Sequence, residues 1–126
     1  MRATAEQAAA HDSLRAPARE LLTALQTLQS ATRAAWMDAT PEQALANATP
    51  YLQAFGHVVL AWVWLRQALV AQRALAKATG SDLDFYRGKL NACQYFYRYE
   101  LPKVAERCAL LARFDDTCLA TDENWF

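Results

Sequence analysis

An all-α fold is the first prediction that this sequence supports, and three observations lead to it. Residues that favour helices dominate, with Ala, Leu, Gln, Arg and Glu all frequent. Apolar residues recur every three or four positions over long stretches. The 126 residues contain only 3 glycines and 4 prolines, which leaves room for two or three chain reversals. We therefore predict one domain, residues 1–126, built as an antiparallel bundle of three long, partly kinked helices with a C-terminal tail.

The first predicted helix covers about residues 3–38. Its apolar positions follow the spacing of a helix packed on neighbours. They are Leu14, Ala18, Leu21, Leu25, Leu28 and Ala35. Pro17 lies inside this span, so the helix is either kinked there or begins near it.

The second predicted helix covers about residues 41–79. Thr40 and Gln43 flank Pro41 and Glu42 in the pattern of a capping box, and Gly80 suits the left-handed conformation that ends a helix. Pro50 predicts a kink just upstream, near Asn47. The segment carries two apolar stripes, Leu45, Ala48, Leu52, Phe55, Val59, Trp62 and Leu69, and then Tyr51, Ala54, Val58, Ala61, Leu65, Ala68 and Leu75. A helix with two such stripes must be covered on both sides, so we predict that it is central.

The third predicted helix covers about residues 82–113, with Ser81 as its N-terminal cap. It carries one long apolar stripe and a second, partly aromatic one that includes Phe85, Ala92, Phe96 and Tyr99. Pro102 predicts a kink in its middle. The tail, residues 114–126, shows no clear period.

The two later helices carry more apolar surface than a three-helix bundle can cover. Either the tail or a partner must cover the excess, and we expect a partner. The candidate interface residues are Phe55, Trp62, Phe96 and Tyr99. Whether the tail docks on the bundle stays open.

The ionisable residues show no pattern that indicates a catalytic site. His57 lies among apolar residues and His11 in an Ala-rich start, so a structural role is the plainer interpretation for both. Asp82 and Asp84 open a helix, where the macrodipole explains them. Asp115 and Asp116 open the tail, and Glu100 can pair with Arg98 or Lys103. We therefore predict no catalytic residue.

Metal and cofactor sites are also not expected. Neither histidine has a second ligand four residues away, and the three cysteines, Cys93, Cys108 and Cys118, lack metal-ligand spacing. Gly56, Gly80 and Gly88 are isolated, so there is no glycine-rich phosphate loop. Arg87, Lys89 and Arg98 could hold a phosphate-bearing ligand, but solvated helix charges explain them more simply.

Charge and hydropathy narrow the choice of partners. All 13 basic and nine of the 13 acidic residues lie in residues 1–114, giving +4, while residues 115–126 carry −4. No long basic run exists, so we expect no nucleic-acid binding. The most apolar stretch, Phe55 to Leu65, has 11 residues where a membrane span needs about 20, so we expect a buried helix and no membrane. The odd cysteine count and an N-terminus without a signal-peptide core indicate a cytoplasmic protein.

Two groups of motifs resemble a known family. NATPYLQAFGHVV (47–59), followed by AW (61–62) and LRQ (65–67), is similar to the C-terminal extension of one acyl-CoA dehydrogenase subgroup, the 3-methylmercaptopropionyl-CoA dehydrogenase-like enzymes. YRGKL (86–90), YFY (95–97) and LP (101–102) resemble the same module. The resemblance covers about residues 10–112, and its motifs are packing motifs.

The resemblance implies a parent enzyme of fatty acid metabolism. Such an enzyme is a flavoprotein that uses FAD and a glutamate base to remove hydrogens from the α and β carbons of an acyl-CoA thioester. The flavin and the base belong to domains upstream of this module, so no FAD-binding residue is carried onto this chain. A complete enzyme of this type is several times longer, so we expect the chain to be a fragment or an excised domain.

Two functions from different classes remain open. In the first, the chain is a C-terminal helical module that packs against upstream acyl-CoA dehydrogenase domains and either stabilises their assembly or borders the substrate entrance. In the second, it is a free-standing helical domain that associates with a second copy of itself through its aromatic faces. Both lead us to expect a homo-oligomer.

Overall fold

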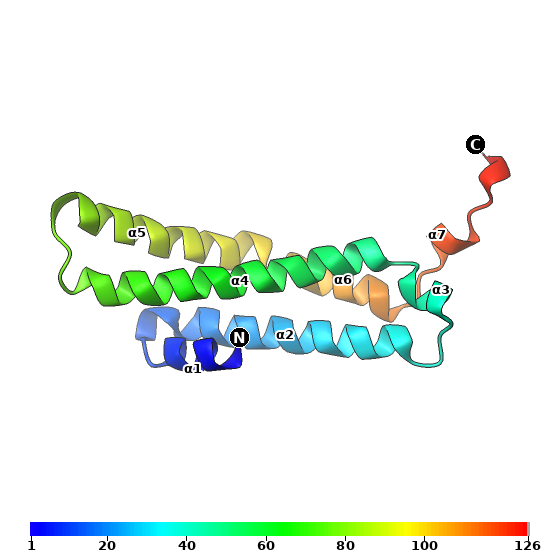
Figure 1. Cartoon of the computed structure of the whole chain (residues 1–126), viewed down its shortest axis with the longest axis horizontal. Coiled ribbons are helices and arrows are strands. Elements are labelled where there is room, and N and C mark those ends of the chain that lie inside the picture. The colour runs from blue at the N-terminus through cyan, green and yellow to red at the C-terminus, as the bar shows by residue number, and fades with distance from the viewer. Residues whose placement is uncertain (126) are drawn as a thin grey trace.

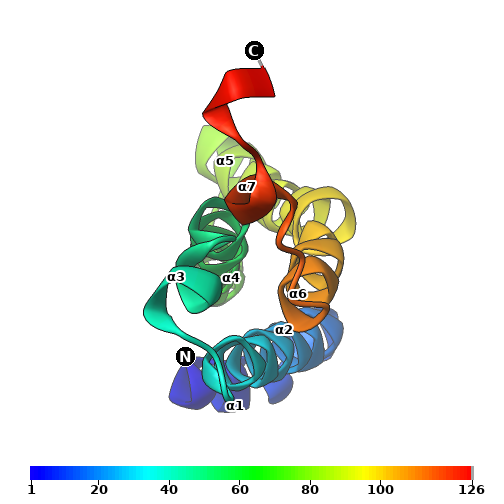
Figure 2. The ribbon, with the colours of Figure 1, turned by 90° about the vertical axis from the view of Figure 1, so that its right-hand side faces the viewer.

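The computed structural model describes residues 1–125, and it confirms the all-α prediction: these residues form helices and no strand. The last position of the predicted tail, 126, lies outside the described residues. Seen end-on, α2, α4 and α6 stand at the corners of a triangle, with α1 beside α2 (Figure 2). The structure differs from the predicted three long, partly kinked helices, however, because each expected helix is divided into separate segments near a proline.

The first expected helix splits into two. Helix α1 (Arg2–Ala9) is followed by a reversal through the 3-10 turn η1 (Asp12–Leu14), and α2 (Arg15–Trp36) then runs back beside it (Figure 1). Pro17 has no N–H to donate to the carbonyl of residue 13, so it is tolerated in the first turn of α2 and not inside a longer helix. Helix α1 buries Ala5 and Ala8 in the core.

The second expected helix begins with the predicted capping box. The Thr40 hydroxyl accepts from the Gln43 backbone N–H (3.3 Å), and the Gln43 side chain accepts from the Thr40 N–H (2.9 Å). The resulting helix α3 (Pro41–Leu45) is short, and α4 (Ala48–Leu75) starts after a break at the predicted place, Asn47. The chain leaves α4 at Leu75, four residues before the predicted end at Thr79.

The third expected helix is α5 (Gly80–Tyr95), a π-helical turn η2 (Phe96–Glu100) and α6 (Lys103–Ala112). Gly80 has the predicted left-handed backbone (φ 56°). The Ser81 cap is wrong, since Thr79 takes the N-cap position without a side-chain hydrogen bond. Pro102 causes the predicted interruption. The turn before it closes with a Leu101 N–H to Phe96 carbonyl bond (3.0 Å).

Helix α4 is central, as predicted, because it contacts α1, α2, α5 and α6. Its second predicted stripe lies in the core, where the buried members are Ala54, Val58, Ala61, Leu65 and Ala68. The alanines let the neighbouring helices approach closely, and Val58 and Leu65 fill the space between them. Leu21, Val104 and Cys93 bring α2, α6 and α5 into the same core.

By length and composition, α4 would also suit a membrane crossing. Its mean hydropathy reaches 1.4 over an 18-residue window, of which 39% is buried inside the bundle. The central helix of a water-soluble bundle meets the same criterion, since it must be apolar to be covered by its neighbours.

The tail leaves the end of the bundle where α3 and the start of α4 lie (Figure 1). Asn47 holds the tail near its start, because the buried Asn47 Nδ2 donates to the Asp115 carbonyl (2.6 Å). Beyond that point α7 (Thr117–Ala120) and the 3-10 turn η3 (Glu123–Trp125) project away from the helices, and Trp125 is 71% exposed. The described part of the tail therefore does not cover the apolar faces of the bundle.

Candidate interaction surface

The first predicted stripe of α4 faces outward near the start of the helix, where Leu52 is 68% exposed and Phe55 is close to half exposed, whereas Leu69 near the other end is buried. Leu60, which belongs to neither predicted stripe, is also close to half exposed. The Phe55 ring stacks on the ring of Tyr51, with centroids 6.4 Å apart, which holds it against the helix. Side chains of this size cost free energy when they are left in water, so this face suits burial against another surface.

An aromatic stripe on α5 and η2 is exposed as well. Phe85, Tyr95 and Tyr99 all expose more than half of their surface, and the rings of Tyr95 and Tyr99 stack 4.8 Å apart. Their spacing places them on one side of the α5–η2 segment. The neighbouring side of this segment carries an exposed polar stripe, made of Asp84, Arg87, Asn91 and Arg98. The segment therefore has one side suited to water and one suited to a partner.

A surface groove of about 360 Å³ lies between the packed helices α4 and α5. Its apolar lining includes Val63, Val70 and Phe85. The charged residues in its lining are Arg66 and Lys89, both cations. The Arg66 guanidinium lies 5.1 Å from the ring centre of Trp62, and the Lys89 ammonium lies 5.3 Å from that of Phe85.

The four residues predicted at the interface lie in different environments. Phe55 and Tyr99 are exposed and remain part of the candidate surface. Trp62 is half-buried, and its indole N–H donates to the Thr4 hydroxyl of α1 (2.8 Å). Phe96 is only 8% exposed and packs near His57, with ring centroids 6.2 Å apart. The structure thus removes Phe96 from the surface and gives Trp62 an internal role.

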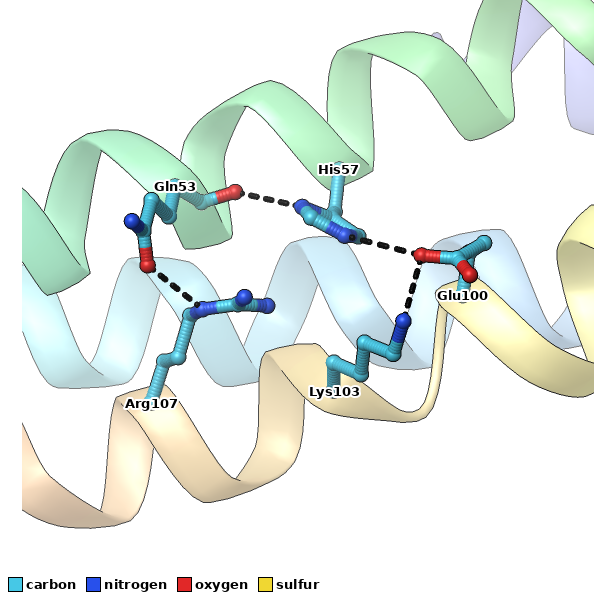
Figure 3. A network of polar contacts seen from close by, with 5 residues as sticks. All are labelled: Gln53, His57, Glu100, Lys103 and Arg107. Carbon is cyan, nitrogen blue, oxygen red and sulfur yellow. Dashed lines mark hydrogen bonds and ion pairs between the residues drawn. The ribbon is translucent and has the colours of Figure 1, made fainter.

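A polar network joins α4 to η2 and α6 (Figure 3). Glu100 Oε2 lies 2.7 Å from Lys103 Nζ and 3.5 Å from His57 Nε2, while His57 Nδ1 lies 2.8 Å from the Gln53 carbonyl. One turn along α6, Arg107 Nε donates to Gln53 Oε1 (3.1 Å). Of the two partners expected for Glu100, Lys103 is confirmed, and Arg98 is on the polar stripe.

This network is built to tie helices together. The hydrogen bond from Lys103 is the main reason that the pKa of Glu100 lies below its ordinary value, with His57 adding to the effect. A general acid would need the opposite shift and a substrate cavity beside it. The residues that line the two most apolar grooves include neither His57 nor Glu100. We therefore assign the network a structural role.

Comparison with known proteins now identifies the family. Residues 1–122 match the model of the acyl-CoA dehydrogenase C-terminal family, described as acetyl-CoA dehydrogenase C-terminal like. The chain belongs to this family. Over 77 residues it is also 32% identical to the broad-specificity linear acyl-CoA dehydrogenase FadE5 of Mycobacterium tuberculosis. That match covers 60% of this chain and 13% of the enzyme, so the chain corresponds to a small part of its relative.

The family match confirms the resemblance at the level of the family, and the subgroup stays a prediction. Gly56 lies inside α4 and Gly88 inside α5, and Gly80 is the first residue of α5, so none of the three belongs to a glycine-rich turn between a strand and a helix.

The thiols give this family member no reactive centre in its core. Burial raises the pKa of Cys93 to about 12 and raises that of Cys108, so both stay protonated at neutral pH. Cys118, on α7, is exposed. Among residues 1–125, no three His, Cys, Asp or Glu side chains gather where they could hold a metal ion.

Two structural features were missed from the sequence. The Tyr97 hydroxyl donates to the Ala61 carbonyl (3.0 Å) inside the core, which anchors η2 to α4. The α4–α5 groove with its two cations was also missed, although the three-four spacing of Arg66 with Val63 and Val70 and of Lys89 with Phe85 was visible. What no pattern showed is that these two helix faces would lie side by side.

Proposed function

We propose that this chain is the C-terminal helical module of an FAD-dependent acyl-CoA dehydrogenase, and that it acts in packing and assembly. The observation that carries the proposal is the exposure of large apolar side chains on α4 (Leu52 and Phe55) and on α5–η2 (Tyr95 and Tyr99). In a family whose described relative is a dehydrogenase about eight times as long as the match, these side chains have a large body to pack against. FAD and the acyl-CoA site would belong to that body, in a cytoplasmic homo-oligomer.

The polar network supports the same role. It ties α4 to η2 through His57 and Glu100 and to α6 through Gln53 and Arg107, so the exposed side chains of α4 are presented on a rigid support. A rigid apolar surface loses little conformational entropy when it binds, which favours stable association.

The test uses the full-length gene product with Leu52→Ser and Phe55→Ser in this module. We expect a smaller assembly by light scattering and a lower thermal midpoint of the flavin-loaded protein, with kcat per bound flavin nearly unchanged. The matched control is Asp84→Ser with Arg87→Ser on the polar stripe of α5, which should alter none of these. An unchanged assembly in the Leu52/Phe55 variant, or a gene product without a dehydrogenase body, would contradict the proposal.

A second candidate is a free-standing domain that associates with its own copies. The observation in its favour is the pairing of a cationic groove and an acidic tail on one chain, which gives the domain complementary surfaces of its own.

A further inference from the structure

The acidic tail and the cationic groove are complementary but lie at opposite ends of the bundle. The tail leaves beside the start of α4, where Asn47 holds Asp115 (Figure 1). The groove lies near the other end of α4, at Arg66 and Val70. At about 1.5 Å per helical residue, Arg66 and Val70 are about 28 to 35 Å from Asn47 along the helix.

The tail of one chain does not reach its own groove in the described conformation. The eleven residues from Asp115 to Trp125 are joined by ten Cα–Cα steps and would span about 35 Å only if they were fully extended. They include α7 and η3, both of which shorten the segment. Docking within the chain would therefore require both turns to unfold.

The tail carries the acidic side chains that the lining of the groove lacks. Asp122 and Glu123 are exposed, and the η3 turn holds them next to Trp125. Asp122 accepts from the backbone N–H of Asn124 (2.8 Å) and from its Nδ2 (2.7 Å), so this acidic turn is already ordered. These two bonds keep the pKa of Asp122 below its ordinary value, and its carboxyl is charged at neutral pH.

The groove is open to such a ligand. Among the described residues, neither Arg66 nor Lys89 has a carboxylate partner within 4.0 Å. Its volume of about 360 Å³ is enough for one indole, and Val63, Val70 and Phe85 supply an apolar lining. Cations at its edge would favour both the ring of Trp125 and the two carboxylates.

We infer that two copies of this chain associate antiparallel and exchange tails, with Trp125 of each copy in the α4–α5 groove of the other and Asp122 and Glu123 beside Arg66 and Lys89. An antiparallel arrangement brings the tail end of one bundle to the groove end of its partner. The contact is then made twice about a two-fold axis, and the assembly closes as a dimer. The inference rests on the proposed assembly role and names a partner for it.

The test is a charge exchange in the 126-residue chain, read by sedimentation velocity over a range of concentrations. The tail variant carries Asp122→Lys and Glu123→Lys, and the groove variant carries Arg66→Glu and Lys89→Glu. Each alone places like charges at both contacts, so we expect a dimerisation Kd at least tenfold weaker than that of the wild type. An equimolar mixture pairs opposite charges at both contacts and should restore a mixed dimer.

Two more variants separate this arrangement from others. Trp125→Ala should also weaken the dimer at least tenfold, as loss of a buried interface tryptophan does. Trp36→Ala is the matched control, because Trp36 is exposed outside the groove and the tail. Circular dichroism of each variant confirms that the helices stay folded.

The inference is overturned if the wild type is a monomer at every concentration, if the dimer survives all these changes, or if mixing restores nothing. The proposed function is tested separately: it holds if the Leu52→Ser and Phe55→Ser variant still disrupts the full-length assembly, even when the tail exchange is not observed. Conversely, if the isolated chain exchanges tails but the Leu52→Ser and Phe55→Ser variant leaves the full-length assembly unchanged, the inference holds for the isolated chain and the proposed function is contradicted.

Discussion

The two apolar stripes of α4 lie in different environments. The inner one buries Val58 and Leu65 under the neighbouring helices, whereas the outer one exposes Leu52 and Phe55 and buries only its far end, at Leu69. The inner stripe contains three alanines that allow close approach, while the outer stripe carries larger side chains. The comparison shows that an apolar pattern alone does not tell which face of a helix is covered. The size of the side chains adds information, because small side chains let another helix of the same chain come close enough to cover that face.

The largest effect should come from truncating the same residue type on each stripe. Leu65→Ala should lower the free energy of unfolding by about 3 kcal/mol, because it leaves a cavity in a completely buried site. Leu52→Ala should change it by less than about 0.5 kcal/mol in the isolated chain. Urea denaturation followed by circular dichroism measures both. Similar losses for the two would mean that the outer stripe is already covered in solution.

A second pair of variants compares a buried and an exposed tyrosine within η2. Tyr97→Phe removes the buried hydroxyl that donates to the Ala61 carbonyl, so we expect a loss of about 1 to 2 kcal/mol. Tyr99→Phe, two residues away, removes an exposed hydroxyl and should be neutral. Thermal unfolding of the two variants side by side measures the difference. A neutral Tyr97→Phe would show that the π-helical turn is held by packing alone.

The capping box gives a similar or slightly smaller effect. Thr40→Ala removes the acceptor for the Gln43 N–H at the start of α3 and should cost about 1 kcal/mol. Thr40→Ser keeps a hydroxyl and serves as the control. The helix α3 lies with the tail at one end of the bundle, so loss of its cap should open it locally. Faster hydrogen exchange of the α3 amides in Thr40→Ala measures that opening.

The smallest effect concerns pH and the network between α4 and α6. The folded pKa of Glu100 is lowered, chiefly by Lys103, so its contribution is fully present above the pKa of an unfolded glutamate and is lost as the pH falls through the folded value. Glu100→Gln should therefore flatten the acid side of the stability profile below about pH 5, with little change in its slope at pH 7. Glu106→Gln, on the exposed side of α6, is the control. An identical acid limb in wild type and Glu100→Gln would show that the carboxylate contributes nothing to folding.

Local chemistry explains which parts of the fold could be predicted. The capping box at Thr40, the break at Asn47 and the interruption at Pro102 each depend on groups within about five residues, so the sequence contains their whole cause. The reversal after Ala9 was missed as a turn because no glycine marks it. Only Pro17 indicated that a helix could start nearby.

The candidate surface was predicted less well, for a physical reason. Phe55 and Phe96 look alike as apolar residues at helical spacing, yet Phe96 is buried and Phe55 is exposed. Phe96 lies at the start of η2 and packs near His57 on α4, whereas Phe55 lies on a side of α4 that stays exposed. Which side of a helix a neighbour covers depends on packing between distant segments, and an apolar pattern within one helix does not show it.

The sequence by itself determined the helical class, the central place of α4, the absence of a glycine-rich phosphate loop and the resemblance that the family match confirmed. These follow from propensities, caps and periodicity, which act within one helix. The tertiary structure alone decided which stripe of α4 is covered, that Phe96 turns inward, and that Arg66 and Lys89 edge one groove. Those outcomes depend on how helices distant in sequence approach each other, and that approach is set by packing between them rather than by any single segment.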